Sequence, residues 1–186
     1  VGEPINPDVW LWFSHVIGHD NLPIVNTWWQ TETGGVLISP LPHDEKFIPG
    51  ASGHPFFGVV PYITAEGLLY IQQPWPGLMQ TIFNDEKRFV DQYLSQPEWG
   101  YFTGDGAYQD EEGFYHITGR VDDVIKLSGH RLGSEELESA LVSHEAVCES
   151  AVIGVPHEIK GESIVAFVVV FNDVERHETL KSTLKH

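Results

Sequence analysis

The chain has 186 residues, 41% of them hydrophobic, so it can form one domain or a larger and a smaller one with a real core. Its formal net charge of −17 argues against a broad surface for nucleic acid or an anionic membrane, and no apolar run approaches the roughly 18 residues that cross a bilayer. One cysteine, Cys148, excludes an internal disulfide framework and fits a reducing compartment; we expect it to be a small core residue in a cytoplasmic protein, because the start carries no signal-peptide pattern.

The first expected element is a helix that begins at Asn6-Pro7-Asp8. Asparagine caps the helix, proline fits its first position, and an acid suits the positive end of its dipole. Gly18 ends it. Its expected core residues, which recur at helical spacing, are Val9, Trp10, Phe13, Val16 and Ile17. Residues 23–27 then predict a short buried strand.

The next stretch, Trp28-Trp29-Gln30-Thr31-Glu32-Thr33-Gly34-Gly35, does not have the pattern of routine core. Aromatic faces beside polar residues can stack on a base or close off a small pocket. Thr31 and Glu32 offer oxygens suited to phosphate groups and to Mg²⁺, which prefers oxygen ligands.

A β-rich region punctuated by prolines and glycines follows. Its apolar stretches predict strands at residues 36–38, 56–62 and 68–72. Residues 85–94 predict a short polar helix.

Two aromatic strands with glycine turns come next. Residues 101–103 are β-prone, Gly104-Asp105-Gly106 and residues 110–113 are typical of turns, and residues 114–118 form the expected returning strand. The flanking glycines let a ligand approach closely, and the Asp105 carboxylate can accept two hydrogen bonds from a vicinal diol such as a ribose.

A local group of basic residues follows this hairpin. Arg120, Lys126 and Arg131 fall within twelve positions of an otherwise acidic chain. They favour an anionic ligand, and ordinary surface pairing with neighbouring carboxylates is the alternative.

The character of the chain changes at Asp122. Beyond it we expect a small hairpin over residues 124–130, a helix capped by Ser134, and apolar strands at residues 148–155 and 164–171. This βαβ-like pattern predicts a second, smaller unit, after which residues 172–186 begin a further helix. The expected domains are therefore residues 1–121 and 122–186.

Four ordered motifs carry a resemblance to a known family. Gly2-Glu3-Pro4, WWQTETGG, GDG and ITGRVDDVIKLSGHRL resemble the adenylate-forming enzymes, the superfamily of acyl-CoA synthetases, adenylation domains and luciferases. Within it the chain is similar, along nearly its whole length, to the family of AMP-forming acetyl-CoA synthetases. The resemblance implies a mixed α/β fold. Residues 1–121 would be the C-terminal portion of the large domain, a sheet with a distorted β-barrel, and residues 122–186 would begin the small mobile domain, with a hinge near Asp122.

The resemblance also implies a reaction. Acetate and ATP would give acetyl-adenylate and pyrophosphate, and CoA would then take the acetyl group and release AMP, with Mg²⁺ as the metal. The chain carries no glycine-rich phosphate loop and no PKTRSGK-like segment with the catalytic lysine, so we expect an inactive part of a longer ligase without a catalytic residue of its own. The alternatives are a synthetase for propionate, acetoacetate or another short acid, and a non-catalytic nucleotide-binding module.

Binding residues follow from the resemblance, and the partners are small molecules rather than nucleic acid or membrane. Where the family has aspartate at position 26 this chain has asparagine, and the family has a longer loop between positions 60 and 68. The implied ATP or AMP contacts are Gly2, Glu3, Pro4, Asn26, Thr27, Trp28, Trp29, Gln30, Thr31, Asp105, Arg120 and Arg131. The implied acyl pocket is Val1 with Trp29, the CoA contacts are Ser128 and Gly129, and the metal contacts are Glu32, Val142, His144 and Val147.

Overall fold

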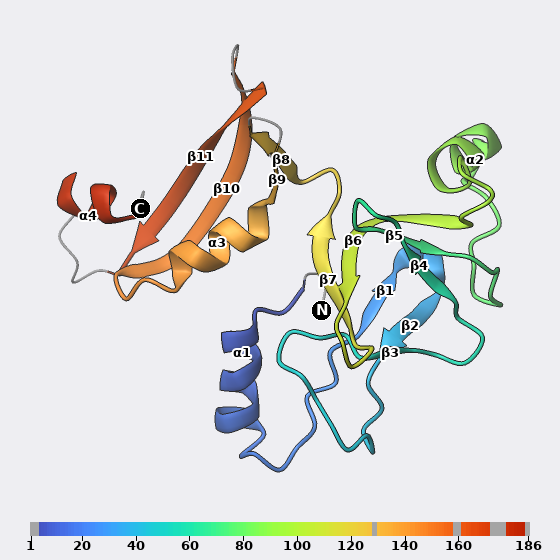
Figure 1. The fold of residues 1–186 in the computed structure, drawn as a ribbon, viewed down its shortest axis with the longest axis horizontal. Coiled ribbons are helices and arrows are strands. Elements are labelled where there is room, and N and C mark those ends of the chain that lie inside the picture. The colour runs from blue at the N-terminus through green and yellow to red at the C-terminus, as the bar shows by residue number, and fades with distance from the viewer. Residues whose placement is uncertain (1–3, 128–129, 158–160, 172–177, 185–186) are drawn as a thin grey trace. The chain divides into compact units, whose positions relative to one another are not determined.

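The computed structural model describes residues 4–127, 130–157, 161–171 and 178–184 (Figure 1). The chain divides into two compact units, Val1–Val121 and Asp122–His186. Each described unit combines helices with antiparallel sheets, which makes the fold mixed α/β, as expected.

The first unit contains two sheets with the strand orders β1-β2-β3 and β4-β5-β6-β7 (Figure 1). Its elements are α1 (Pro7–Trp12), the π-helical turn η1 (Phe13–Ile17), β1 (Trp28–Gln30), the 3-10 turn η2 (Thr31–Thr33), β2 (Gly35–Ser39), β3 (His54–Pro55), β4 (Pro61–Ile63), β5 (Leu68–Ile71), α2 (Glu86–Tyr93), β6 (Tyr101–Gln109) and β7 (Tyr115–Arg120).

One hydrophobic core joins these two sheets. Its buried residues come from β1, β2, β5, β6 and β7, and they are Trp28, Leu37, Ile38, Leu69, Ile71, Tyr101, Ala107 and Tyr115. Complete burial of an aliphatic side chain such as Ile38 or Leu69 contributes about 1.5–3 kcal/mol. The core therefore holds β1 firmly against β6, which places the WWQ segment beside the GDG segment.

The first helix begins as expected, but its apolar residues are not core. The Asn6 side chain accepts a hydrogen bond from the Asp8 backbone N–H at 2.8 Å, Pro7 is the first helical residue, and Gly18 ends the π-helical turn. Of the expected core set, Trp10 is buried by the described residues, whereas Val9, Phe13, Val16 and Ile17 are exposed. The spacing of apolar residues predicts a helix, but it does not say which of these residues are covered.

Two local expectations in this unit are wrong. Residues 23–27 have no strand structure, and the strand begins at Trp28 instead. Gly104-Asp105-Gly106 is not a turn: it lies inside the continuous strand β6, with Gly104 at φ +72° and a register shift after Gly106. The two glycines distort a strand that cross-strand pairing keeps intact, rather than reversing the chain.

The remaining strands agree in part with the sequence pattern. The expected strand over residues 56–62 is wrong for residues 56–60, which have no strand structure, and only the short β4 begins within it, whereas β2, β5 and α2 form where expected. The short connection after β4 closes as a tight hairpin. Thr64 N–H donates to Leu68 O at 3.0 Å, and Gly67 N–H donates to Thr64 O at 2.9 Å.

The second unit contains an antiparallel sheet with the strand order β10-β11-β8-β9. Its elements are β8 (Val124–Leu127), β9 (His130–Gly133), α3 (Ser134–Val142), β10 (Val147–His157), β11 (Gly161–Val170) and α4 (Glu178–Thr183). The expected order of a hairpin, a helix and two strands is found. The last two strands, β10 and β11, form a long antiparallel hairpin, and α3 packs on β10. Ser134 is the first residue of α3 rather than its cap, because Gly133 occupies the cap position.

Among the described side chains of the second unit, the buried hydrophobic ones are Ile125, Ala146, Val147 and Val152. Cys148 is exposed and not in the core, and it lies at an irregularity of β10, where the pairing register shifts between Val147 and Glu149. Within the described ranges, no helix has both the length and the apolar character needed to cross a bilayer.

Candidate nucleotide site

Asp105 is a buried carboxylate at the centre of the first unit. Its exposed fraction is 6%, and its Oδ2 accepts hydrogen bonds from Trp28 Nε1 and Gln30 Nε2, each at 2.9 Å. Arg120 Nη1 approaches Oδ1 at 3.4 Å and donates to Thr103 O at 3.2 Å. The structure thus brings together residues from β1, β6 and β7 that lie far apart in the sequence.

Gly104 allows the guanidinium of Arg120 to come this close. A Cβ atom on Gly104 would lie 2.8 Å from Arg120 Nη2, and the residue has a positive φ that L side chains rarely adopt. The side chain of Arg120 remains nearly half exposed. An arginine beside a carboxylate in this way can contact the oxygens of an anionic ligand.

The amide of Gln30 is fixed by hydrogen bonds on both of its ends. Nε2 donates to Thr103 O at 2.7 Å as well as to Asp105, and Oε1 accepts from the Tyr101 hydroxyl at 3.0 Å. Thr103 in turn donates to Leu69 O and accepts from the Asp105 backbone N–H. Because each group is paired, the Asp105 carboxylate is held in one orientation.

The protonation of Asp105 reflects its burial. Desolvation is the largest influence and raises the pKa of Asp105 above its ordinary value of 3.8. The hydrogen bond from Trp28, the charge of Arg120 and the hydrogen bond from Gln30 oppose this rise. A carboxylate buried in this way has an unfavourable ionised form that further hydrogen-bond donors would stabilise.

Asp105→Asn in the full-length protein is expected to remove a pH-dependent part of the free energy of unfolding. Between the ordinary and the raised pKa, the folded chain keeps a proton that the unfolded chain has released. This contribution to stability is complete below 3.8 and is lost as pH rises through the folded-state pKa. Urea unfolding across a pH series measures it, and the wild type should lose stability over that window relative to Asp105→Asn. Parallel curves for the two proteins would contradict the raised pKa.

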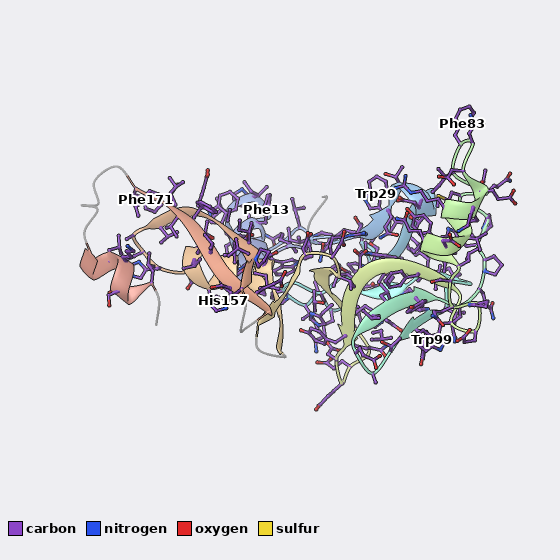
Figure 2. All side chains as sticks on the ribbon, turned by 90° about the horizontal axis from the view of Figure 1, so that it is seen from above. Phe13, Trp29, Phe83, Trp99, His157 and Phe171 are labelled. Atoms are coloured by element: carbon purple, nitrogen blue, oxygen red, sulfur yellow. The ribbon has the colours of Figure 1, made fainter. Side chains whose placement is uncertain are left out.

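The two tryptophans of β1 point in opposite directions. Trp28 is 6% exposed and lies in the core, where its indole N–H serves Asp105, whereas Trp29 is 45% exposed. Figure 2 shows Trp29 at the surface of the first unit. Trp28 therefore supports the Asp105 carboxylate from within the core, whereas the indole of Trp29 is exposed.

Glu32 lies on the 3-10 turn that follows β1. Its Oε1 accepts a hydrogen bond from the Tyr93 hydroxyl at 2.9 Å, and its backbone O accepts from Met79 N–H at 3.0 Å. Trp75 Nε1 donates to the neighbouring Thr33 O at 2.8 Å. The segment over residues 75–79 thus holds the turn that carries Glu32.

The contact between residues 75–79 and the turn that carries Glu32 depends on two glycines, Gly34 and Gly77. Gly34 ends the turn at φ +66°, and a Cβ atom there would lie 2.3 Å from Gly77 O. We expect Gly34→Ala to lower the free energy of unfolding of the first unit, since the left-handed conformation alone costs an alanine roughly 1–2 kcal/mol and the clash adds to it. The matched control is Gly35→Ala, where no atom lies within 4 Å of the added Cβ. Thermal unfolding measures both, and equal melting temperatures for the two variants would contradict the close contact.

Several of the residues predicted to contact the nucleotide have neighbours other than Asp105 and Arg120. Asn26 donates from its amide to Ala51 O at 3.0 Å and more distantly to Gly50 O and Ser52 Oγ, so asparagine here supplies a donor that aspartate lacks. Thr31 is exposed on the turn beside Glu32, and Thr27 and Pro4 are half-buried.

The predicted metal and CoA residues of the second unit lie apart from this site in the chain. Val142 ends α3, and His144 O accepts a hydrogen bond from Val147 N–H at 2.9 Å. Asp122 is exposed at the start of the unit. Val1, Gly2, Glu3, Ser128 and Gly129 lie outside the described residues, as does the side chain of Arg131.

Sequence reasoning missed the residues that support this site. The hydroxyl of Tyr93 donates to Glu32, and that of Tyr101 donates to Gln30. The hydroxyl of Thr103 accepts from the β6 backbone. The sequence pattern could have indicated Tyr101 and Thr103, because these residues and Asp105 recur at the two-residue period of one strand face. Nothing in the sequence pairs Tyr93 with Glu32.

Two family comparisons match this chain. The AMP-binding enzyme family matches residues 1–77, and the AMP-binding enzyme C-terminal domain matches residues 136–186. The chain belongs to this family of adenylate-forming enzymes, as its motifs predicted.

Among individual proteins, the chain is similar to acetyl-coenzyme A synthetases. The chain is 54% identical, over 100% of its length, to an acetyl-coenzyme A synthetase of Shewanella frigidimarina, and 52% identical, over 99%, to that of Magnetococcus marinus. It spans 30% of the length of each relative. The ATP-bound crystal structure of MatB from Rhodopseudomonas palustris matches 98% of this chain and 37% of its own, with a TM-score of 0.82 at 26% identity.

Proposed function

We propose that the chain is part of an AMP-forming acetyl-CoA synthetase and that it carries the ribose and acyl portions of the active site. The observation that carries the proposal is the Asp105 carboxylate, which Trp28, Gln30 and Arg120 hold in a fixed orientation. Support comes also from the identity above 50% to acetyl-coenzyme A synthetases along the whole chain.

The proposed reaction has two steps. A carboxylate oxygen of acetate attacks the α-phosphorus of ATP, the bond to pyrophosphate breaks, and acetyl-AMP forms. The CoA thiol loses its proton and attacks the acyl carbon, the bond between that carbon and the phosphate oxygen breaks, and AMP leaves.

The residues of this chain would act by position and charge rather than as nucleophiles. Asp105 would accept ribose hydroxyls at Oδ1, because two donors already occupy Oδ2 whereas Arg120 Nη1 approaches Oδ1 only at 3.4 Å. Arg120 would contact nucleotide oxygens from the neighbouring strand. Gly2 to Pro4, residues 26–31 and Arg131 would line the remainder of the nucleotide, and Trp29 with Val1 would close the acyl pocket.

Glu32 fits a Mg²⁺ ion held between the protein and ATP. Mg²⁺ is usually bound through one or two carboxylates together with substrate phosphates. Among the described residues, no three His, Cys, Asp or Glu side chains gather as a site made by protein alone. When bound, the ion would neutralise phosphate charge. We propose a second Mg²⁺ site at the main-chain oxygens of Val142, His144 and Val147. If the single change Glu32→Gln abolished all Mg²⁺ binding, that result would count against the second site.

The second unit would serve the CoA step. Ser128 and Gly129 would lie by the CoA thiol, and the unit would turn about Asp122, where the two compact units meet in sequence. Hydrogen exchange that reports one cooperative unit across Asp122 would contradict this. We also propose a cytoplasmic location, which cell fractionation tests.

The experiment that tests the function is acetate-dependent exchange of pyrophosphate into ATP by the full-length protein. We expect exchange with acetate to exceed exchange with propionate and butyrate, because the indole of Trp29 leaves room for a short chain. Preference for propionate or butyrate would favour a related short-chain synthetase. Nucleotide binding without exchange would favour the non-catalytic module.

A further inference from the structure

Tyr93 connects helix α2 to the proposed metal residue. It stands 61 positions from Glu32 and donates its hydroxyl hydrogen to Glu32 Oε1 at 2.9 Å. It also lies between the two segments that match the family, residues 1–77 and 136–186. We propose that Tyr93 is a positioning residue that holds the Glu32 carboxylate in place for Mg²⁺–ATP, and this rests on the metal role of Glu32 in the proposed function.

The hydroxyl of Tyr93 is held in one place by its ring. The ring stacks on Tyr101 with 5.4 Å between centroids and 2° between planes, and it lies 6.0 Å from the ring of Phe89. Phe89 is buried and anchors α2, whose cap Asp85 accepts from Arg88 N–H at 3.1 Å. The ring of Tyr101 is itself fixed by its burial in the core. The donor that Glu32 meets is therefore preorganised.

Glu32 has the properties of a side chain that needs such a donor. Its backbone is fixed by Met79, but a half-buried glutamate with a long side chain still has several rotamers. Ordering a side chain of this kind costs rotamer entropy. A hydroxyl bonded to Oε1 selects one rotamer before the ligand arrives and leaves Oε2 for the metal.

The stacked partner of Tyr93 provides an internal control. The two hydroxyls belong to parallel rings, but Tyr93 serves Glu32 whereas Tyr101 serves Gln30, which in turn binds Asp105. Loss of the first hydroxyl should affect the metal-dependent part of ATP binding. Loss of the second should affect ATP binding with and without metal.

The experiment compares Tyr93→Phe and Tyr101→Phe in the full-length protein by titration calorimetry of ATP, with Mg²⁺ and with a chelator. We expect Tyr93→Phe to lose roughly 10- to 100-fold of the Mg²⁺-dependent gain in ATP affinity, as is typical when a metal ligand loses its hydrogen-bond partner, and to keep the metal-free affinity. Tyr101→Phe should weaken ATP binding equally under both conditions. In a Glu32→Gln background, Tyr93→Phe should have no further effect on the Mg²⁺-dependent gain, because the two residues act as one unit.

Three results would overturn the proposal. Tyr93→Phe could lose equal ATP affinity with and without Mg²⁺, or its melting temperature could fall enough to account for the lost affinity. The effects of Tyr93→Phe and Glu32→Gln could also be additive. The proposed function fails separately, when the wild type shows no acetate-dependent exchange. The calorimetry requires no acetate, so it tests Tyr93 in either case.

Discussion

Trp29→Gly in the full-length protein is expected to lower kcat/KM for acetate and to raise it for butyrate and longer straight-chain acids. The indole of Trp29 faces away from the core on β1, beside Glu32 and Thr31, and would limit the length of the acyl chain. Each methylene buried in the opened cavity contributes about 0.8 kcal/mol, so the two extra methylenes of butyrate correspond to roughly a fifteenfold gain relative to acetate. Kinetics across a series of straight-chain acids measure the change.

The control for this variant is Phe83→Gly. Phe83 is an aromatic residue with an exposed fraction of 88%, and it lies at a different place on the first unit from Trp29 (Figure 2). Its removal should leave the order of preferred acids unchanged. A Trp29→Gly protein that keeps the wild-type preference for acetate would make Trp29 a surface packing residue and remove the main support for an acetate pocket in this chain.

Asp105→Ala is expected to weaken ATP binding and to lower the melting temperature together. Hydrogen bonds to a charged group contribute about 1.5–3 kcal/mol each, so loss of one ribose contact should weaken binding at least roughly tenfold. The same change leaves Trp28 Nε1 and Gln30 Nε2 without their shared acceptor, at about 1–3 kcal/mol for each buried group. ATP titration and thermal unfolding measure the two effects.

Two further variants separate binding from stability. Asp105→Asn keeps one oxygen for Trp28 and Gln30, so it should lose ATP affinity with little loss of melting temperature. Asp110→Ala removes a carboxylate from the turn of the same hairpin, where it accepts from Phe114 N–H at 2.9 Å and from Glu112 N–H at 3.0 Å. It should lower stability and leave ATP binding unchanged. Wild-type ATP affinity in both Asp105 variants would show that Asp105 is structural.

Local chemistry in the sequence predicted much of the fold. The cap at Asn6, the breaker at Gly18 and helix α2 depend on neighbouring residues, and each lies where its pattern indicates. The GDG segment shows the limit of such reasoning. Its glycines indicated a turn, but β5 and β7 pair with β6 on both sides and keep it extended, because pairing across a sheet overrides local preference.

The sequence by itself determined the family, through motifs whose order and spacing are specific, and it singled out Asp105, Arg120 and Trp29. Only the tertiary structure decided which of the two neighbouring tryptophans faces the core, since alternation along a strand places them on opposite faces without saying which face is buried. It also decided that Tyr93 meets Glu32. That contact joins side chains 61 positions apart, and packing of α2 against the core, rather than any local pattern, brings them together.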